Sequence, residues 1–189
     1  RQMPELVERG HIYIAQPPLY KVKAGKEELY LKDAGALDSF LLRIALVNAA
    51  VHTGGEHGSV LSGDTLAELA RKHQVAQAVI ARLRNFMDAE ALRSVADGVA
   101  LNLDTVVDAE ASATALQARL PDAEVAGEFD VRTDKPILRI SRRHHGNVKS
   151  SVLTQDFVHG ADYAAMAEAA NTFRGLLSDG AKVVRGEGE

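Results

Sequence analysis

Cysteine and tryptophan are absent from this chain, and aromatic residues make up only 5% of its 189 residues. The absence of cysteine excludes disulfides, thiolate metal sites and cysteine nucleophiles. Because rings are scarce, the core has to be built mainly from Ala, Leu, Val and Ile, and an apolar content of 46% is sufficient for a folded chain. No apolar run reaches the ~18 to 20 residues that a membrane-spanning helix needs, so we expect no membrane partner.

An excess of positive charge is also missing, since the formal net charge is −4. Nucleic-acid-binding domains are usually basic, so contact with DNA would have to come from local patches. The sequence offers two of them. The first lies on or beside a predicted hairpin and comprises Lys21, Lys23, Lys26 and Lys32. The second lies on a predicted strand pair and comprises Arg139, Arg142, Arg143, His144, His145 and Lys149.

Both patches have a plain structural alternative. Nearby acidic residues would offset the lysines of a solvated hairpin in the first patch. In the second, successive strand residues point to opposite faces, so Arg142 is separated from Arg139, Arg143 and His145. Positive charge on an edge hairpin also discourages aggregation between strands.

Chemical motifs are scarce. His144 and His145 cannot easily share one metal ion, because neighbouring strand residues point apart. Glu128, Asp130 and Asp134 imitate a magnesium-type carboxylate group, but they alternate with basic residues and indicate a charged solvent face. No glycine-rich segment carries the Gly-Lys-Ser/Thr ending of a phosphate loop. We therefore predict no catalytic residue and no metal ligand in this chain.

The first part of the chain is predicted to contain a helix, a strand, a hairpin and a short helix. Pro17-Pro18 forms a rigid corner before the hairpin. The hairpin shows strand alternation on both sides of a Gly-containing turn. These elements are expected at residues 1–8, 12–15, 19–31 and 36–42.

The remainder indicates long helices, then a small antiparallel sheet and a closing helix. Residues 42–53 alternate like a strand, and a loop follows at 54–59. The strongest helical periodicity covers 66–87, with a capping box at 65–68. Further helices are expected at 88–95, 104–120 and 161–177, and strands at 129–133, 137–145 and 148–153, the last two joined by a Gly146-Asn147 turn. This order predicts an α+β fold.

Two stretches near the start carry a family resemblance. They are Met3–Ala15, M-P-E-L-V-E-R-G-H-I-Y-I-A, and Gln16–Val22, Q-P-P-L-Y-K-V. Both resemble the DNA gyrase B family of type IIA topoisomerases, at the end of its metal-binding TOPRIM domain. Beyond Leu46 the order of elements resembles the large insertion of many Gram-negative gyrases. The resemblance implies the end of an α/β TOPRIM domain at 1–46, an α+β insertion domain at 47–185 and a frayed tail at 186–189.

The resemblance also implies a function for the parent protein. The family introduces negative supercoils into DNA with ATP and Mg²⁺ as cofactors, in the bacterial cytoplasm at the nucleoid. The acids of its metal site and its ATP site lie outside this segment, which is therefore expected to be non-catalytic and to hold no cofactor. Expected partners are DNA, gyrase A and other domains of gyrase B. The residues expected to contact DNA or a partner are Lys21, Lys23, Lys26, Lys32, Arg139, Arg142, Arg143, His145 and Lys149.

Three alternatives stay open. The segment is a protein-interaction domain that docks on gyrase A or on the ATPase domain without touching DNA, or it is a nucleic-acid-binding module that uses the hairpin at 139–149. In the third, the parent is the gyrase B counterpart in topoisomerase IV, which is similar over the first segment but lacks the insertion as a family.

Overall fold

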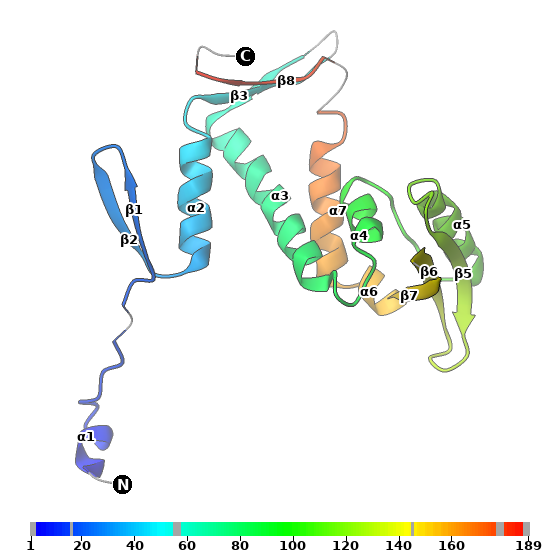
Figure 1. The fold of residues 1–189 in the computed structure, drawn as a ribbon, viewed down its shortest axis with the longest axis horizontal. Coiled ribbons are helices and arrows are strands. Elements are labelled where there is room, and N and C mark those ends of the chain that lie inside the picture. The colour runs from blue at the N-terminus through cyan, green and yellow to red at the C-terminus, as the bar shows by residue number, and fades with distance from the viewer. Residues whose placement is uncertain (1–2, 16, 55–57, 145, 177–179, 187–189) are drawn as a thin grey trace. The chain divides into compact units, whose positions relative to one another are not determined.

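A computed structural model describes residues 3–15, 17–54, 58–144, 146–176 and 180–186 (Figure 1). Its internal contacts divide the chain into two compact units, Arg1–Val47 and Asn48–Glu189. Both units combine helices with small antiparallel sheets, which confirms the α+β class.

The first unit contains a two-stranded antiparallel hairpin. Strand β1 (Tyr20–Ala24) pairs with β2 (Glu27–Leu31), and Gly25 in the two-residue turn has the positive φ, +62°, that glycine adopts readily. Side chains along β1 alternate between half-buried and exposed, with Lys21 and Lys23 on the exposed face. The predicted hairpin and its alternation are confirmed.

The helices of this unit depart from prediction in their extent. Helix α1 covers only Pro4–Glu8, and the strand expected at 12–15 is wrong, because those residues are exposed and pair with no strand among the described residues. Helix α2 (Ala34–Ala45) is longer than predicted at both ends. The carboxylate of Asp33 accepts the N–H of Ala36 at 2.7 Å and caps it.

The second unit begins with a three-stranded antiparallel sheet of order β4-β3-β8. Its central strand is β3 (Ala49–His52), flanked by β4 (Val60–Ser62) and β8 (Lys182–Arg185). The strand predicted at 42–53 is therefore only partly right. Its first residues belong to α2, and Asn48, with a left-handed φ of +57°, separates that helix from β3.

The last described residues join the first sheet of this unit, and the frayed tail expected at 186–189 stays a prediction. Arg185 belongs to strand β8, and the N–H of Gly186 donates to the carbonyl of Asn48 at 2.9 Å. Residues 187–189 lie outside the described residues. The first and last parts of this unit consequently meet in one sheet.

Two long helices pack side by side and antiparallel, α3 (Gly63–Leu83) and α7 (Ala161–Phe173) (Figure 1). The Nζ of Lys72 in α3 lies 3.1 Å from the Oε1 of Glu168 in α7. A second ion pair joins Arg82, near the end of α3, to Asp162 in the first turn of α7. Over the described ranges, no helix combines the length and the apolar character needed to cross a bilayer.

The boundaries of α3 show where periodicity misleads. Ser62 precedes its first residue and no side chain caps it, so the capping box predicted at 65–68 is wrong. The helix also ends before the predicted residue 87, because 84–87 form a turn. Asp88 then caps helix α4 (Ala89–Ala96) by accepting two backbone N–H groups at 3.0 Å, which matches the predicted start of that helix.

The second sheet of this unit has the order β5-β6-β7. Its strands are β5 (Glu124–Asp130), β6 (Lys135–His144) and β7 (Asn147–Thr154), antiparallel throughout. The predicted strand at 129–133 overlaps β5 only at residues 129–130. Residues 131–134, including Asp134 with φ +56°, form the turn that follows β5. Asn147 pairs with His144 and so lies in β7 instead of in the predicted turn.

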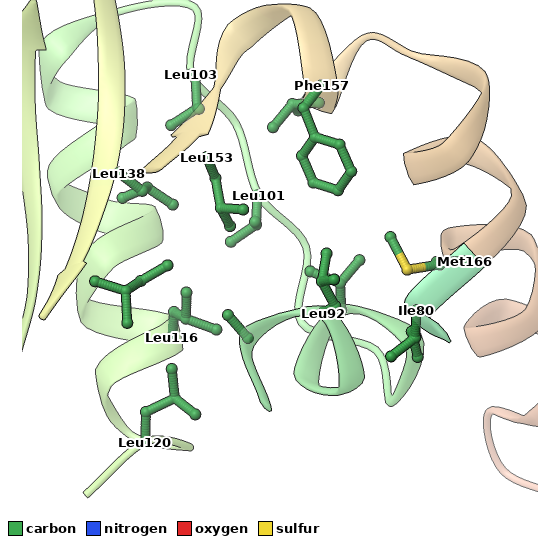
Figure 2. Packing of buried hydrophobic residues seen from close by; sticks show 14 of the residues in the cluster. Ile80, Leu92, Leu101, Leu103, Leu116, Leu120, Leu138, Leu153, Phe157 and Met166 are labelled. Carbon is green, nitrogen blue, oxygen red and sulfur yellow. The ribbon is translucent and has the colours of Figure 1, made fainter. Parts of the chain in front are cut away.

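Aliphatic side chains join this sheet to the helices. The remaining helices are α5 (Val106–Gln117) and α6 (Gln155–Val158). Figure 2 shows Leu116 of α5 facing Leu138 of β6, with Leu92 of α4 and Met166 of α7 continuing the same core. The largest fully buried side chains are Leu92, Leu103, Leu116, Leu120, Leu138, Ile140, Leu153, Met166 and Val95. Burying one such side chain stabilises a fold by about 1.5–3 kcal/mol, so this core holds the helices and the sheet together.

Candidate nucleic-acid interface

The lysine patch of the first unit lies on and beside hairpin β1–β2, with Lys21 and Lys23 on its exposed face, Lys26 in the turn and Lys32 directly after β2. Lys21 and Lys23 share a single carboxylate, Glu28, at 3.0 and 3.9 Å. Lys26 and Lys32 have no acidic partner in the described part of the chain. The four lysines outnumber the one carboxylate that pairs with them, so the hairpin carries the local positive charge that contact with phosphates requires.

The basic patch of the second unit lies on hairpin β6–β7, and strand alternation divides it between two faces. Arg142 lies on the face that also carries the buried side chains of Leu138 and Ile140. Arg139 and Arg143 lie on the opposite face. The structure therefore divides the arginines of this patch between the two faces of β6, as the alternation predicts.

Arg142 is engaged inside the unit. Its Nε donates to Asp88 at 2.6 Å, and its Nη2 donates to Asp88 at 3.2 Å and to Glu90. Burial raises the pKa of Asp88, but the hydrogen bonds from Arg142 and from the N–H groups of Ala91 and Glu90 outweigh it and hold the pKa below its ordinary value. The same hydrogen bond with Asp88 raises the pKa of Arg142. Arg142 thus ties β6 to the start of α4.

The other members of the patch differ in what they contact. Arg139 donates through Nε to Glu128 at 2.9 Å. Arg143 and Lys149 have no acidic partner among the residues that the structure describes. His145 lies outside the described residues. Arg143 and Lys149 are therefore the cations of this patch that are open to an external anion.

A polar cavity of about 310 Å³ lies beside Arg142. It is lined by Arg84, Asn85, Phe86, Met87, Asp88, Ala89, Arg142, Lys149, Ser150 and Ser151. The sequence predicts Arg142 and Lys149 as contact residues here, but it does not single out Arg84 and Phe86. Arg84 and Phe86 are missed because the helical periodicity of the sequence continues to residue 87 and assigns both residues to the helix. In the structure α3 ends at Leu83, and residues 84–87 form a turn.

The carboxylates that imitate a magnesium site belong to a turn and an ion pair. Asp130 accepts the N–H of Arg132 and the hydroxyl of Thr133, both at 2.9 Å, and the bond from Arg132 is the main cause of a lowered pKa of Asp130. Glu128 bonds to Arg139. Across the described ranges, no group of three or more His, Asp or Glu side chains is placed to hold a metal ion.

A larger cavity, of about 810 Å³, is lined mainly by apolar side chains of β3, β4, β8, α3 and α7. Val51, Leu69 and Phe173 are among its walls, and Arg119 and Arg174 also line it. None of the predicted contact residues takes part in it.

Comparison with known families decides the origin of this unit. A family model described as the DNA gyrase B subunit insert domain matches residues 49–189. The chain belongs to this gyrase B family. A second model, described as the GyrB hook, matches residues 18–46 and so covers hairpin β1–β2 and α2. The resemblance to gyrase B inferred from the sequence is confirmed, whereas the assignment of residues 1–46 to the end of a TOPRIM domain stays a prediction.

Curated relatives carry the same family name. The DNA gyrase B subunit of Caulobacter vibrioides is 36% identical over 170 residues, which are 90% of this chain and 20% of that protein. The gyrase B protein of Rickettsia felis is 47% identical over 72 residues, which are 38% of this chain and 9% of that protein. The gyrase B protein of Helicobacter pylori is 37% identical over 88 residues, which are 47% of this chain and 11% of that protein. The chain spans about a fifth of the length of the Caulobacter gyrase B protein. Because these relatives are gyrase B proteins, topoisomerase IV is not favoured as the parent.

Proposed function

We propose that this chain is a non-catalytic segment of a DNA gyrase B protein that supports DNA binding and couples the subunits and domains of the enzyme. The match of 49–189 to the gyrase B insert family carries the proposal. The parent enzyme would supercoil DNA negatively with ATP and Mg²⁺, in the bacterial cytoplasm at the nucleoid. Its partners would be DNA, gyrase A and the remaining domains of gyrase B.

Two surfaces support contact with DNA. Lys26 and Lys32 in the first unit, and Arg143 and Lys149 in the second, present charges without acidic partners in the described part of the chain. Phosphate contacts need only such local positive patches, so a net charge of −4 does not oppose them.

The coupling role is supported by the way the second unit is cross-linked. Arg142 joins β6 to α4, and ion pairs join α3 to α7. Because these ion pairs stiffen the second unit, it could transmit force between neighbouring domains or subunits, or keep them apart by its volume. We assign the magnesium and ATP chemistry of the parent to its other parts.

Deletion of residues 49–185 from a full-length gyrase B that contains this segment tests the proposal. After reconstitution with gyrase A, we expect at least a several-fold loss of supercoiling, of DNA-stimulated ATPase and of DNA affinity. Retention of the DNA-independent ATPase would show that the shortened protein is folded. If all three activities stayed at the undeleted level, the segment would have no supporting role.

A second function, docking on gyrase A or on the ATPase domain without DNA contact, is favoured by the 810 Å³ apolar cavity. A photocrosslinker at position 149 of the assembled enzyme separates the two functions. Adducts with DNA support the first, and adducts with protein alone support the second.

A further inference from the structure

The cavity of about 310 Å³ beside Arg142 gathers cations that the fold itself does not use. Three basic residues line it, Arg84, Arg142 and Lys149, against one carboxylate, that of Asp88. Asp88 is already bound by Arg142 through two hydrogen bonds. The positive charge of the other two side chains therefore stays uncompensated within the described residues.

Lys149 adds a second cation to the face of the hairpin that carries Arg142. In the register of the β6–β7 ladder, Lys149 lies directly opposite Arg142, and like charges in that relation destabilise a strand pair. Asp88 and Glu90 both hydrogen-bond to the guanidinium of Arg142, and neither bonds to Lys149. The ammonium of Lys149 is therefore open to an external anion.

The lining of the same cavity includes a hydroxyl without a partner. The Oγ of Ser151 is buried and has no hydrogen bond to any described residue. Ser151 lies opposite Ile140 and two residues after Lys149, so it shares the face of Lys149. A buried hydroxyl without a partner destabilises the fold, and an acceptor atom in the cavity would supply the missing hydrogen bond.

The lining of the cavity also includes an exposed ring. Phe86 is 79% exposed, although phenylalanine is scarce in this chain. It is two residues from Arg84, and both residues line the cavity. An apolar ring next to a pair of cations suits a ligand that alternates anionic groups with apolar surface.

We propose that Arg84, Lys149 and Ser151 bind a backbone phosphate of duplex DNA, with Phe86 against the adjoining deoxyribose. This site rests on the DNA contact in the proposed function and gives it a location. The guanidinium, the ammonium and the hydroxyl all donate to the non-bridging oxygens, which suits the tetrahedral phosphate group. Arg142 is a positioning residue, because its bonds to Asp88 and Glu90 hold the β6–β7 hairpin beside the turn at 84–87.

The test is the affinity of the 189-residue chain for a fluorescent duplex of about 20 base pairs, measured by anisotropy between about 50 and 200 mM salt. Arg84→Glu combined with Lys149→Glu should weaken binding at least about tenfold. The neutral pair Arg84→Gln and Lys149→Gln should lower the slope of log affinity against log salt by about 1, because the contact with the one phosphate of this site is lost. Ser151→Ala and Phe86→Ala should each weaken binding a few-fold.

The matched control reverses two other exposed arginines, Arg71 and Arg93, which line neither cavity. This control changes the net charge by the same amount, so it should weaken binding less than about threefold if the site is local. An equal loss in both double variants would overturn the site and leave only a long-range charge effect. Unchanged affinity in the Arg84/Lys149 double variants would overturn it as well.

Failure of the site can be told from failure of the proposed function. If Lys21→Glu combined with Lys26→Glu weakens DNA binding while the Arg84/Lys149 variants do not, DNA contact stands and this site falls. If neither this chain nor full-length gyrase B binds duplex DNA in a salt-dependent way, both fall. If the Arg84/Lys149 variants lose affinity for gyrase A but none for DNA, the cavity binds protein and the phosphate site is wrong.

Discussion

Gly127 of β5 lies directly against the backbone of Ala109 of α5. A Cβ at position 127 would lie 2.6 Å from the carbonyl carbon of Ala109 and 2.6 Å from the amide nitrogen of Glu110. Only a residue without a side chain allows the helix to approach the strand so closely. This contact fixes how α5 covers the sheet that carries hairpin β6–β7.

Gly127→Ala should therefore lower the free energy of unfolding by about 1–3 kcal/mol or more, because helix and strand have to separate to admit the methyl group. Urea unfolding of the 189-residue chain measures this change. The matched control is Gly35→Ala in α2, where the new Cβ meets only an oxygen of Asp33 at 3.4 Å. Helix propensity makes this control neutral or stabilising by about 0.5–1 kcal/mol. Equal stability of the two variants would contradict the close approach.

The bridge between Arg142 and Asp88 should make stability depend on pH. The folded pKa of Asp88 lies below its ordinary value of 3.8, so the bridge stabilises the fold above that value and its contribution is lost as the pH falls through the folded pKa. Arg142→Gln should cost about 1–3 kcal/mol at about pH 7 and less at about pH 3, since protonation of Asp88 removes part of the same interaction.

Chemical denaturation at both pH values measures this difference. Lys135→Gln provides the control, because Lys135 and Asp156 form an exposed pair at the end of the same sheet. Solvent screens exposed pairs of this kind, so the control should lose little stability at either pH. A loss for Arg142→Gln that did not change with pH would argue against the charged bridge.

Gln117 holds the connection between α5 and β5 with a single side chain. Its Nε2 donates to the carbonyls of Leu120 and Ala123, at 2.9 and 2.8 Å, and its Oε1 accepts the N–H of Val125 at 2.9 Å. Gln117→Ala should cost about 1–3 kcal/mol through the polar groups left without partners. Gln117→Glu should cost at least as much at neutral pH, because a carboxylate cannot donate to the two carbonyls. Thermal unfolding ranks the two variants, and a stable glutamate variant would contradict this assignment.

The hydroxyl of Tyr163 in α7 forms hydrogen bonds with both the backbone N–H and the backbone carbonyl of Leu101. The oxygen accepts the N–H of Leu101 at 2.7 Å and the hydroxyl donates to the Leu101 carbonyl at 3.2 Å. Tyr163→Phe should lower the free energy of unfolding by about 1–2 kcal/mol and speed hydrogen exchange at the Leu101 amide. Loss of stability without faster exchange at this amide would indicate a packing effect instead.

Local patterns in the sequence predict the local elements of this fold. Hairpin β1–β2 follows from alternation on both sides of Gly25, and α7 follows from apolar residues at helical spacing. Strand β8 could not be predicted in the same way. Its partner strand, Ala49–His52, lies far earlier in the sequence, and β8 forms because the fold brings the two strands side by side. Pairing over such a separation is decided by tertiary contacts and leaves little signal in the segment itself.

The candidate site was predictable to a similar degree. Alternation places Arg142 and Arg143 on opposite faces of β6, but it cannot say that Arg142 meets Asp88, which is 54 residues away. Without this partner, all the cations of the patch look equivalent. Arg84 and Phe86 escape prediction because their role depends on a turn that brings them beside β7.

The hydrogen bond from the N–H of Gly186 to the carbonyl of Asn48 shows that the first and last described residues of the second unit lie next to each other. A unit of this kind can be placed within another domain without forcing the two cut ends of its host apart. It also predicts that the order of its elements can be changed. A chain that starts within residues 54–58, with 186 joined to 48 by a short linker, should keep the sheet β4-β3-β8 and the core around Leu92, because every contact in them survives the change of starting point.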